Sequence, residues 1–196
     1  MMNDGKAATD GRAMRSQRSK QAMIDAAVHL VVDLGFFPTA QQVADEAGVT
    51  IRTLFRHFPD MDVLYREVHQ ASITQFAKEY DKALREGDLD DRIRSVLLTF
   101  SAAYKKQQNL ILVTKGRMLQ SDFLRANYKK LQKALVPKLA EFIPELNSLS
   151  VDNRELLVAL VSFEFWNRMV NVQGNSQKRY VLKTLALVKV VLSEEL

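Results

Sequence analysis

The sequence predicts an all-α protein of about nine helices. Its 196 residues include only seven glycines and four prolines, too few for a sheet-rich chain with many tight turns. Good helix formers such as Ala, Leu, Lys, Arg, Glu and Gln dominate the composition. Apolar residues also recur at helical spacing along most of the chain, so we expect helices almost throughout.

Cap and stop signals divide the chain into three parts. We expect a disordered basic arm over residues 1–15, a bundle of three short helices over 16–59 and a larger helical domain over 60–196. The second boundary follows Pro59, because proline stops a helix and Asp60 can cap the next one. Residues 1–20 carry five basic side chains against two acidic ones. Such an arm can track phosphates, or it is simply a solvated tail.

Two helices in the middle part are short and are separated by a glycine. Residues 39–42 read Thr-Ala-Gln-Gln, which is a capping box between Thr39 and Gln42. The helix that starts there ends before Gly48, and Thr50 caps the next helix, which reaches His57.

The other helices follow from apolar spacing and from Gly35, Gly87 and Gly116, which act as stop signals. We expect Pro137 to kink the helix that contains it. The expected ranges are 16–34, 60–86, 88–104, 110–115, 121–142, 152–172 and 176–192.

Composition argues against several classes of protein. There is no cysteine, which excludes disulfides, thiol catalysis and cysteine-bound metals. No Gly-rich phosphate loop, nucleophile–base pair or metal-ligand cluster is recognisable, so we expect neither an enzyme nor a cofactor or metal. The longest apolar run, residues 156–163, is too short to span a bilayer. Because the N-terminus also lacks a secretory signal, we expect a cytoplasmic protein without a membrane partner.

Helix, tight turn and helix is the geometry of a DNA-reading unit, whose second helix enters the major groove. The side chains left over after packing have suitable chemistry. Arg52 and Arg56 can pair with guanine or phosphate, and Thr53 offers a hydroxyl and a methyl group. The alternative is that the two arginines are ordinary solvated charges.

Residues 17–69 resemble the DNA-binding domain of the TetR family of transcriptional regulators. The resemblance rests on the pattern V-A-x-x-A-G-V-T-x-x-T-L-F-R-H-F-x-D over residues 43–60, together with QAMIDAAVHLVVDLGF over 21–36. It implies a helix-turn-helix DNA-binding domain followed by a helical effector-binding and dimerisation domain. The rest of the chain fits the family only in length, in helical character and in two long final helices.

The resemblance also implies roles for individual residues. Thr39 matches a residue that caps the second helix and touches phosphate, and His57 matches a histidine of similar role. Phe55 replaces a tyrosine whose hydroxyl commonly meets phosphate, so its ring is expected to meet a thymine methyl or a sugar. Arg52 replaces a small residue and is a candidate base reader. The expected DNA-binding residues are Thr39, Gln42, Thr50, Arg52, Thr53, Phe55, Arg56 and His57.

Some of these residues have a structural alternative. Gln42 serves as a capping partner whether or not it also reads a base, and His57 caps or packs the helix if it does not contact phosphate. Met61 stands where the family often has a phosphate-binding lysine, and Arg56 is expected to supply that charge instead.

The last two helices are apolar over more than one face, which is too much for packing on one side only. This predicts a four-helix interface between two copies, as the resemblance also implies. The alternative is a large intramolecular core. The expected partners are a double-stranded DNA operator and a second copy of the chain.

Family members typically bind an effector within the helical body. Aromatic and thioether side chains of the kind that line apolar pockets lie there. The alternative is that they only fill the core. We expect a small apolar or amphipathic effector. Residues 105–138 carry nine basic side chains and a single acidic one, Asp122. This basic segment is either a solvated face or a surface that attracts an anionic effector. The candidate ligand-binding residues are Phe100, Tyr104, Met118, Phe123, Phe163 and Trp166.

The sequence therefore predicts a sequence-specific DNA-binding regulator. It is expected to act as a repressor that binds a palindromic operator as a dimer and is released by a small molecule. The alternative is a DNA-binding regulator without a small-molecule ligand, either constitutive or controlled by another protein.

Overall fold

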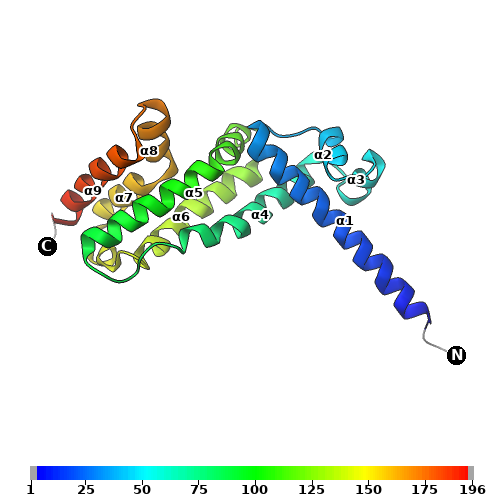
Figure 1. Ribbon diagram of the computed structural model, residues 1–196, viewed down its shortest axis with the longest axis horizontal. Helices are drawn as coiled ribbons and strands as arrows, with labels where there is room; N and C mark the ends of the chain where they lie inside the picture. The colour runs from blue at the N-terminus through cyan, green and yellow to red at the C-terminus, as the bar shows by residue number, and fades with distance from the viewer. Residues whose placement is uncertain (1–3, 194–196) are drawn as a thin grey trace. The chain divides into compact units, whose positions relative to one another are not determined.

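The computed structural model describes residues 4–193, apart from the side chains of residues 4–10, 12, 75 and 76. Within that range the chain forms nine α-helices and no strand, which confirms the all-α prediction (Figure 1). A 3₁₀ turn (Pro144–Ser148) and a π turn (Arg168–Val172) complete it. The helices are α1 (Asp4–Leu34), α2 (Ala40–Glu46), α3 (Ile51–His57), α4 (Met61–Tyr80), α5 (Leu89–Arg117), α6 (Asp122–Ala140), α7 (Val151–Val161), α8 (Phe163–Asn167) and α9 (Gln177–Ser193).

The chain forms two compact units. The first comprises residues 1–75 and 108–124, and the second comprises residues 76–107 and 125–196. Both α4 and α5 therefore contribute to each unit. The boundary expected after Pro59 falls inside the first unit, because Leu64 and Val68 of α4 belong to the same buried cluster as Leu54 and Phe58.

The first unit is held by one apolar core, in which α1 packs against α2 and α3 (Figure 1). Its fully or nearly fully buried members come from the first four helices, apart from Phe58, which directly follows α3. Because α2 and α3 have only seven residues each, too few for independent stability, this burial is what keeps them helical. The members are Met23, Ile24, Ala27, Val28, Val43, Ala44, Leu54, Phe58, Leu64 and Val68.

The expected disordered arm over residues 1–15 is wrong for residues 4–15, because α1 already begins at Asp4. Residues 1–3 lie outside the described residues. The physical reason is that lengthening a helix costs far less than nucleating one. The packed segment around Met23 and Ala27 supplies the nucleus, and alanines precede it at positions 7, 8 and 13.

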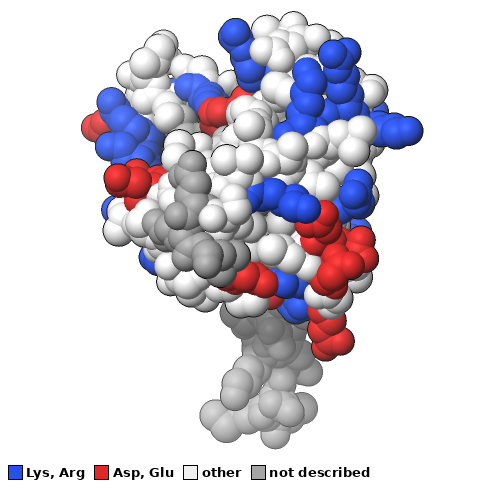
Figure 2. Space-filling model, turned by 90° about the vertical axis from the view of Figure 1, so that its left-hand side faces the viewer, with Lys and Arg blue, Asp and Glu red and all other residues white. Residues whose placement is uncertain are grey.

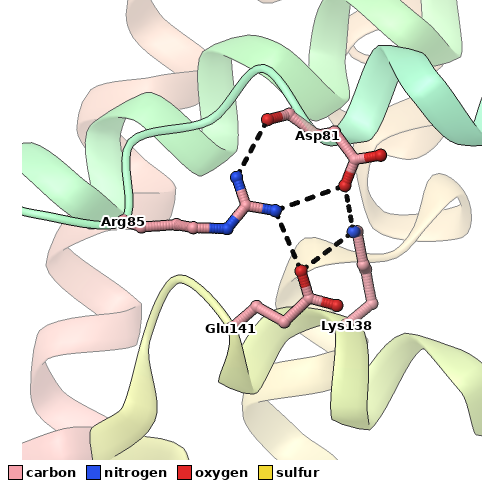
Figure 3. A network of polar contacts seen from close by, with 4 residues as sticks. All are labelled: Asp81, Arg85, Lys138 and Glu141. Carbon is pink, nitrogen blue, oxygen red and sulfur yellow. Dashed lines mark hydrogen bonds and ion pairs between the residues drawn. The ribbon is translucent and has the colours of Figure 1, made fainter.

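Helix α4 ends at Tyr80 rather than at Glu86, because the following residues make tertiary contacts. The carboxylates of Asp81 and Glu141 alternate with Arg85 and Lys138 in a ring of ion pairs (Figure 3). Arg85 Nη2 lies 3.0 Å from Glu141 Oε2, and Lys138 Nζ lies 3.1 Å from the same oxygen. These cations lower the pKa of both carboxyl groups. The ring ties the α4–α5 loop to the end of α6.

Helix α5 is continuous, whereas two helices over 88–104 and 110–115 were expected. The polar stretch over residues 105–109 interrupts the apolar pattern, but its residues still favour a helix. Gln107 is buried, and Asn109 Nδ2 donates to Val32 O at 2.7 Å. Tertiary contacts thus carry the helix through the polar stretch.

The single helix expected over residues 152–172 is also wrong. Helix α7 stops at Val161 because Ser162 has extended backbone angles, and the Ser162 hydroxyl then caps α8 by accepting from Phe165 N. Helix α6 contains Pro137 within a continuous helical span.

Candidate nucleic-acid interface

The capping box at the start of α2 is confirmed. Gln42 N donates to Thr39 Oγ1 at 3.3 Å, and Thr39 N donates to Gln42 Oε1 at 2.8 Å. The Gln42 oxygen is thereby engaged, and the exposed Thr39 side chain lies at the positive end of the helix. The arrangement suits an anion such as phosphate beside Thr39.

The turn between α2 and α3 depends on Gly48. Its φ of +65° lies in the left-handed region, which side chains with a Cβ rarely adopt. Gly48 N donates to Asp45 O and Val49 N donates to Ala44 O, the two bonds of a Schellman motif. This motif satisfies the last carbonyls of α2 and reverses the chain toward α3.

Helix α3 begins with two threonines that contact each other. Thr53 N donates to Thr50 Oγ1 at 3.2 Å, and the two hydroxyl oxygens lie 3.0 Å apart. A shared hydroxyl pair uses one hydrogen, so the other remains able to donate to an external acceptor. The predicted Thr50 cap is confirmed.

The two faces of α3 differ sharply in exposure. Leu54 and the adjoining Phe58 are fully buried against the core of the first unit. The opposite face exposes Arg52 and Arg56, which stand one turn apart, together with Phe55. The α3 segment therefore presents cationic and apolar side chains to the outside while only its inner row holds it in place.

His57 lies at the edge between these faces and is half-buried. Burial lowers its pKa, and the nearby charges of Arg56 and Lys20 act in the same direction. Nε2 is shielded and has no hydrogen-bond partner among the described residues. Burial and the two cations therefore favour the neutral form of the ring.

Comparison with known proteins bears directly on this segment. The sequence model for bacterial regulatory proteins of the tetR family matches residues 23–68. This range spans the buried part of α1, the helix-turn-helix and the start of α4. Residues 23–68 form a TetR-family DNA-binding domain. The match therefore assigns DNA binding, the activity of this family's domain, to residues 23–68.

Solved structures share the fold over most of the chain. A crystal structure of a transcriptional regulator from Rhodococcus sp. Rha1 matches with a TM-score of 0.67 and 15% identity, covering 91% of this chain and 96% of that one. A TetR-like transcriptional regulator from the same source matches with a TM-score of 0.64 and 20% identity, covering 89% and 96%. No curated protein matches the sequence.

Contacts distant in sequence position the TetR-family domain, and local sequence patterns did not reveal them. The Arg117 guanidinium of α5 lies 4.7 Å from the Tyr65 ring centre and 5.1 Å from that of Phe37. Tyr65 OH in turn donates to Pro38 O at 2.9 Å. Because Pro38 directly precedes Thr39, this cluster sets where α2 starts.

Two side chains of α1 also make contacts that hold helix α3 in place. Lys20 Nζ lies 2.7 Å from Glu67 Oε1 of α4 and 5.9 Å from the centre of the Phe58 ring. His29 lies 3.1 Å from Glu46 at the end of α2. These contacts join α1, α2 and α4 around the base of α3.

The candidate ligand-binding residues do not form one group. Four of them pack together in the second unit: the Tyr104 ring lies 5.6 Å from Phe163, 5.8 Å from Trp166 and 6.3 Å from Phe100. Met118 and Phe123 belong instead to the first unit. There Phe123 contacts His69, with ring centres 6.3 Å apart.

The polar atoms of the aromatic group are satisfied internally. Tyr104 OH donates to Val161 O at 2.8 Å, and Trp166 Nε1 donates to Ser101 Oγ at the same distance. All four rings are at most 4% exposed. The group therefore has the character of a packed core.

Among the described residues, no three His, Cys, Asp or Glu side chains are placed to hold a metal ion. Within the same part of the chain, no helix is long and apolar enough to cross a membrane.

Proposed function

We propose that the chain is a transcriptional repressor that binds a palindromic operator as a homodimer, with one α3 helix in each major-groove half-site. The observation that carries the proposal is the outward face of α3, where Arg52 and Arg56 project from a helix fixed by the Thr50 cap and the buried Leu54. Because its operator is chromosomal DNA, the protein acts in the cytoplasm.

The contacts divide into reading and positioning. Arg52, nearer the start of α3, reads a guanine edge, and Arg56 pairs with guanine or phosphate. The Thr50–Thr53 pair donates to a phosphate and helps fix the register of α3 in the groove. Thr39 contacts phosphate when its hydroxyl turns away from Gln42 Oε1, to which it donates at 3.0 Å. The Gln42 amide nitrogen and His57 complete the surface, and Phe55 supplies its apolar part.

Self-association is supported by apolar side chains exposed on the last helices. Leu156 of α7 is 54% exposed, and Leu182 and Val190 of α9 are 50% and 54% exposed. Figure 2, viewed from the side where α9 ends, has broad uncharged surface between its charged side chains. Exposed apolar surface of this kind marks interaction sites. A two-fold dimer requires half-sites about 34 Å apart or a multiple of that spacing.

An effector that binds the helical body releases the operator in this proposal. Helices α4 and α5 each belong to both compact units, so either helix can carry a change from one unit to the other. A hundredfold loss of DNA affinity needs a coupling free energy of about 2.7 kcal/mol.

One observation favours a second candidate, a regulator without a small-molecule ligand. Phe100, Tyr104, Phe163 and Trp166 pack on one another, and their polar atoms have internal partners. Native mass spectrometry of the purified protein separates the two candidates. A co-purified small molecule that lowers operator affinity supports sensing, whereas unliganded protein whose affinity no cell extract fraction changes supports the second candidate.

Selection of bound sequences from random duplex DNA tests the central claim. The expected result is a palindrome whose half-sites are centred about one helical turn, or a multiple of it, apart. Failure to bind any duplex at low salt would overturn the proposed function, because phosphate contacts are strongest there.

A further inference from the structure

Helix α3 carries an apolar row that its packing covers only in part. Ile51 is 41% exposed and Phe55 is 43% exposed, while Leu54 and Phe58 are fully buried and hold the helix against the core. Positions four apart lie on the same side of a helix. Ile51 and Phe55 therefore form one outward row, directly beside the row of Arg52 and Arg56.

The surroundings of this row match DNA better than a protein partner. Residues 50–58 contain two arginines and no acidic residue, so a cationic margin lines the apolar pair. Thr50, which caps α3, and Thr53 lie at the start of the same helix. The exposed apolar side chains Leu156, Leu182 and Val190 belong to other helices and to the other compact unit.

We propose that Ile51 and Phe55 read thymine methyl groups, so that each half-site places thymines beside the guanine contacted by Arg52. This inference rests on the proposed function and specifies which bases the operator carries at the contacted positions. The C5 methyl of thymine is the apolar group that the major groove offers at base edges. The side chains of Ile51 and Phe55 have no hydrogen-bonding atom. If either contacted a cytosine amino group or a phosphate, it would displace the water bound to that polar group without replacing the lost hydrogen bond.

Replacement of single thymines by deoxyuridine in the selected operator tests the proposal. Uracil keeps every hydrogen-bonding group of thymine and lacks only the methyl. The full-length wild-type protein is expected to bind about fourfold more weakly for each contacted methyl removed, at one or two positions per half-site. Fluorescence anisotropy with labelled duplexes measures this change.

Variants assign the effect to residues. In Phe55→Ala, uracil at one of these positions is expected to have no further effect, and Ile51→Ala is expected to lose sensitivity at another. Arg52→Ala keeps uracil sensitivity while discriminating less at its guanine. Leu119→Ala is the matched control, because Leu119 is 87% exposed and lies outside α3; it should behave like the wild type.

Two results would overturn the inference while leaving DNA binding intact. The first is an operator that tolerates uracil at every position in both half-sites. The second is uracil sensitivity that stays at the wild-type level at every sensitive position in both Phe55→Ala and Ile51→Ala, since the methyls would then act through DNA shape. Absence of any selected operator would instead refute the proposed function. Because Ile51 and Phe55 are exposed, both variants are expected to keep the wild-type circular dichroism spectrum.

Discussion

Arg52 is the side chain on α3 with the strongest claim to read a base. It is exposed at the second helical position, one turn before Arg56, on the face opposite the buried Leu54. The planar guanidinium matches the two acceptors that guanine presents in the major groove. Its contribution should therefore appear in specificity rather than in folding.

Arg52→Ala is expected to relax discrimination at one position of each half-site by about 1–3 kcal/mol per contact. Competition binding with operators mutated at single positions measures this loss. Arg179→Ala, which removes an exposed arginine from α9, is the matched control and should leave discrimination unchanged. Equal discrimination by Arg52→Ala and the wild type would remove Arg52 from the reading role.

His69 makes the stability of the first unit depend on pH. The side chain is 7% exposed, packs against Phe123, and its Nε2 has no partner among the described residues. Burial lowers its pKa below the ordinary value of 6.5. As pH falls through that value, the unfolded chain takes up the proton before the folded one does, so the free energy of unfolding decreases.

Urea denaturation at a series of pH values checks this. Between pH 7.5 and the lowered pKa, His69→Leu is expected to lose less stability than the wild type. His57 also has a lowered pKa, so His57→Gln should reduce the acid loss as well, and the double variant should reduce it further. Identical pH profiles for His69→Leu and the wild type would contradict the assignment.

Among the secondary-structure elements, the short helices α2 and α3 are stabilised by hydrogen bonds at their ends. The capping box of α2, the Schellman motif at Gly48 and the Thr50 cap each satisfy backbone groups that two-turn helices leave open. Arg117 adds a long-range anchor through Tyr65 and Phe37. Together these contacts fix the angle between α2 and α3.

Two glycine substitutions separate backbone strain from packing. Neither Gly48 nor Gly116 has an atom within 4 Å of where a Cβ would stand. Gly48→Ala is expected to destabilise by about 1–2 kcal/mol, because its φ is positive. Gly116→Ala lies inside α5 and is expected to stabilise by about 0.5–1 kcal/mol. Chemical denaturation measures both, and a neutral Gly48→Ala would refute the importance of the left-handed turn.

At the scale of the whole molecule, DNA selectivity requires two copies. A bundle the size of the first unit reads few base pairs, and dimerisation doubles the site. In the proposed dimer, the exposed leucines and valines of α7 and α9 form the surface that pairs. Disruption of that surface should leave each copy folded.

Leu182→Glu is expected to convert dimer to monomer, because it places a charge in an apolar interface. Analytical ultracentrifugation measures the mass, and operator binding should weaken in parallel. Leu119→Glu, the same change at an exposed position in the first unit, should leave the dimer intact. A dimer that survives Leu182→Glu would place the interface elsewhere.

Structural features that depend on near neighbours in the sequence could be predicted from it. The caps at Thr39, Thr50, Asp60 and Asp88 each accept from a backbone N–H three residues later, so the sequence alone located these helix starts. Features that depend on contacts between distant residues could not be predicted in this way. The α4–α5 loop makes two ion pairs with residues more than fifty positions away, Asp81 with Lys138 and Arg85 with Glu141.

Local sequence patterns were enough to predict the all-α fold, the helix-turn-helix and the chemistry of its outward face, because capping and helical periodicity act over three or four residues. The lengths of α1, α5 and α7, and the place of Tyr104 and Trp166 in a packed aromatic core, became clear from the folded chain. The tertiary structure also set Arg117 against Tyr65. The physical reason is that burial and cation–π contacts depend on residues brought together from distant parts of the chain, and periodicity cannot identify those partners.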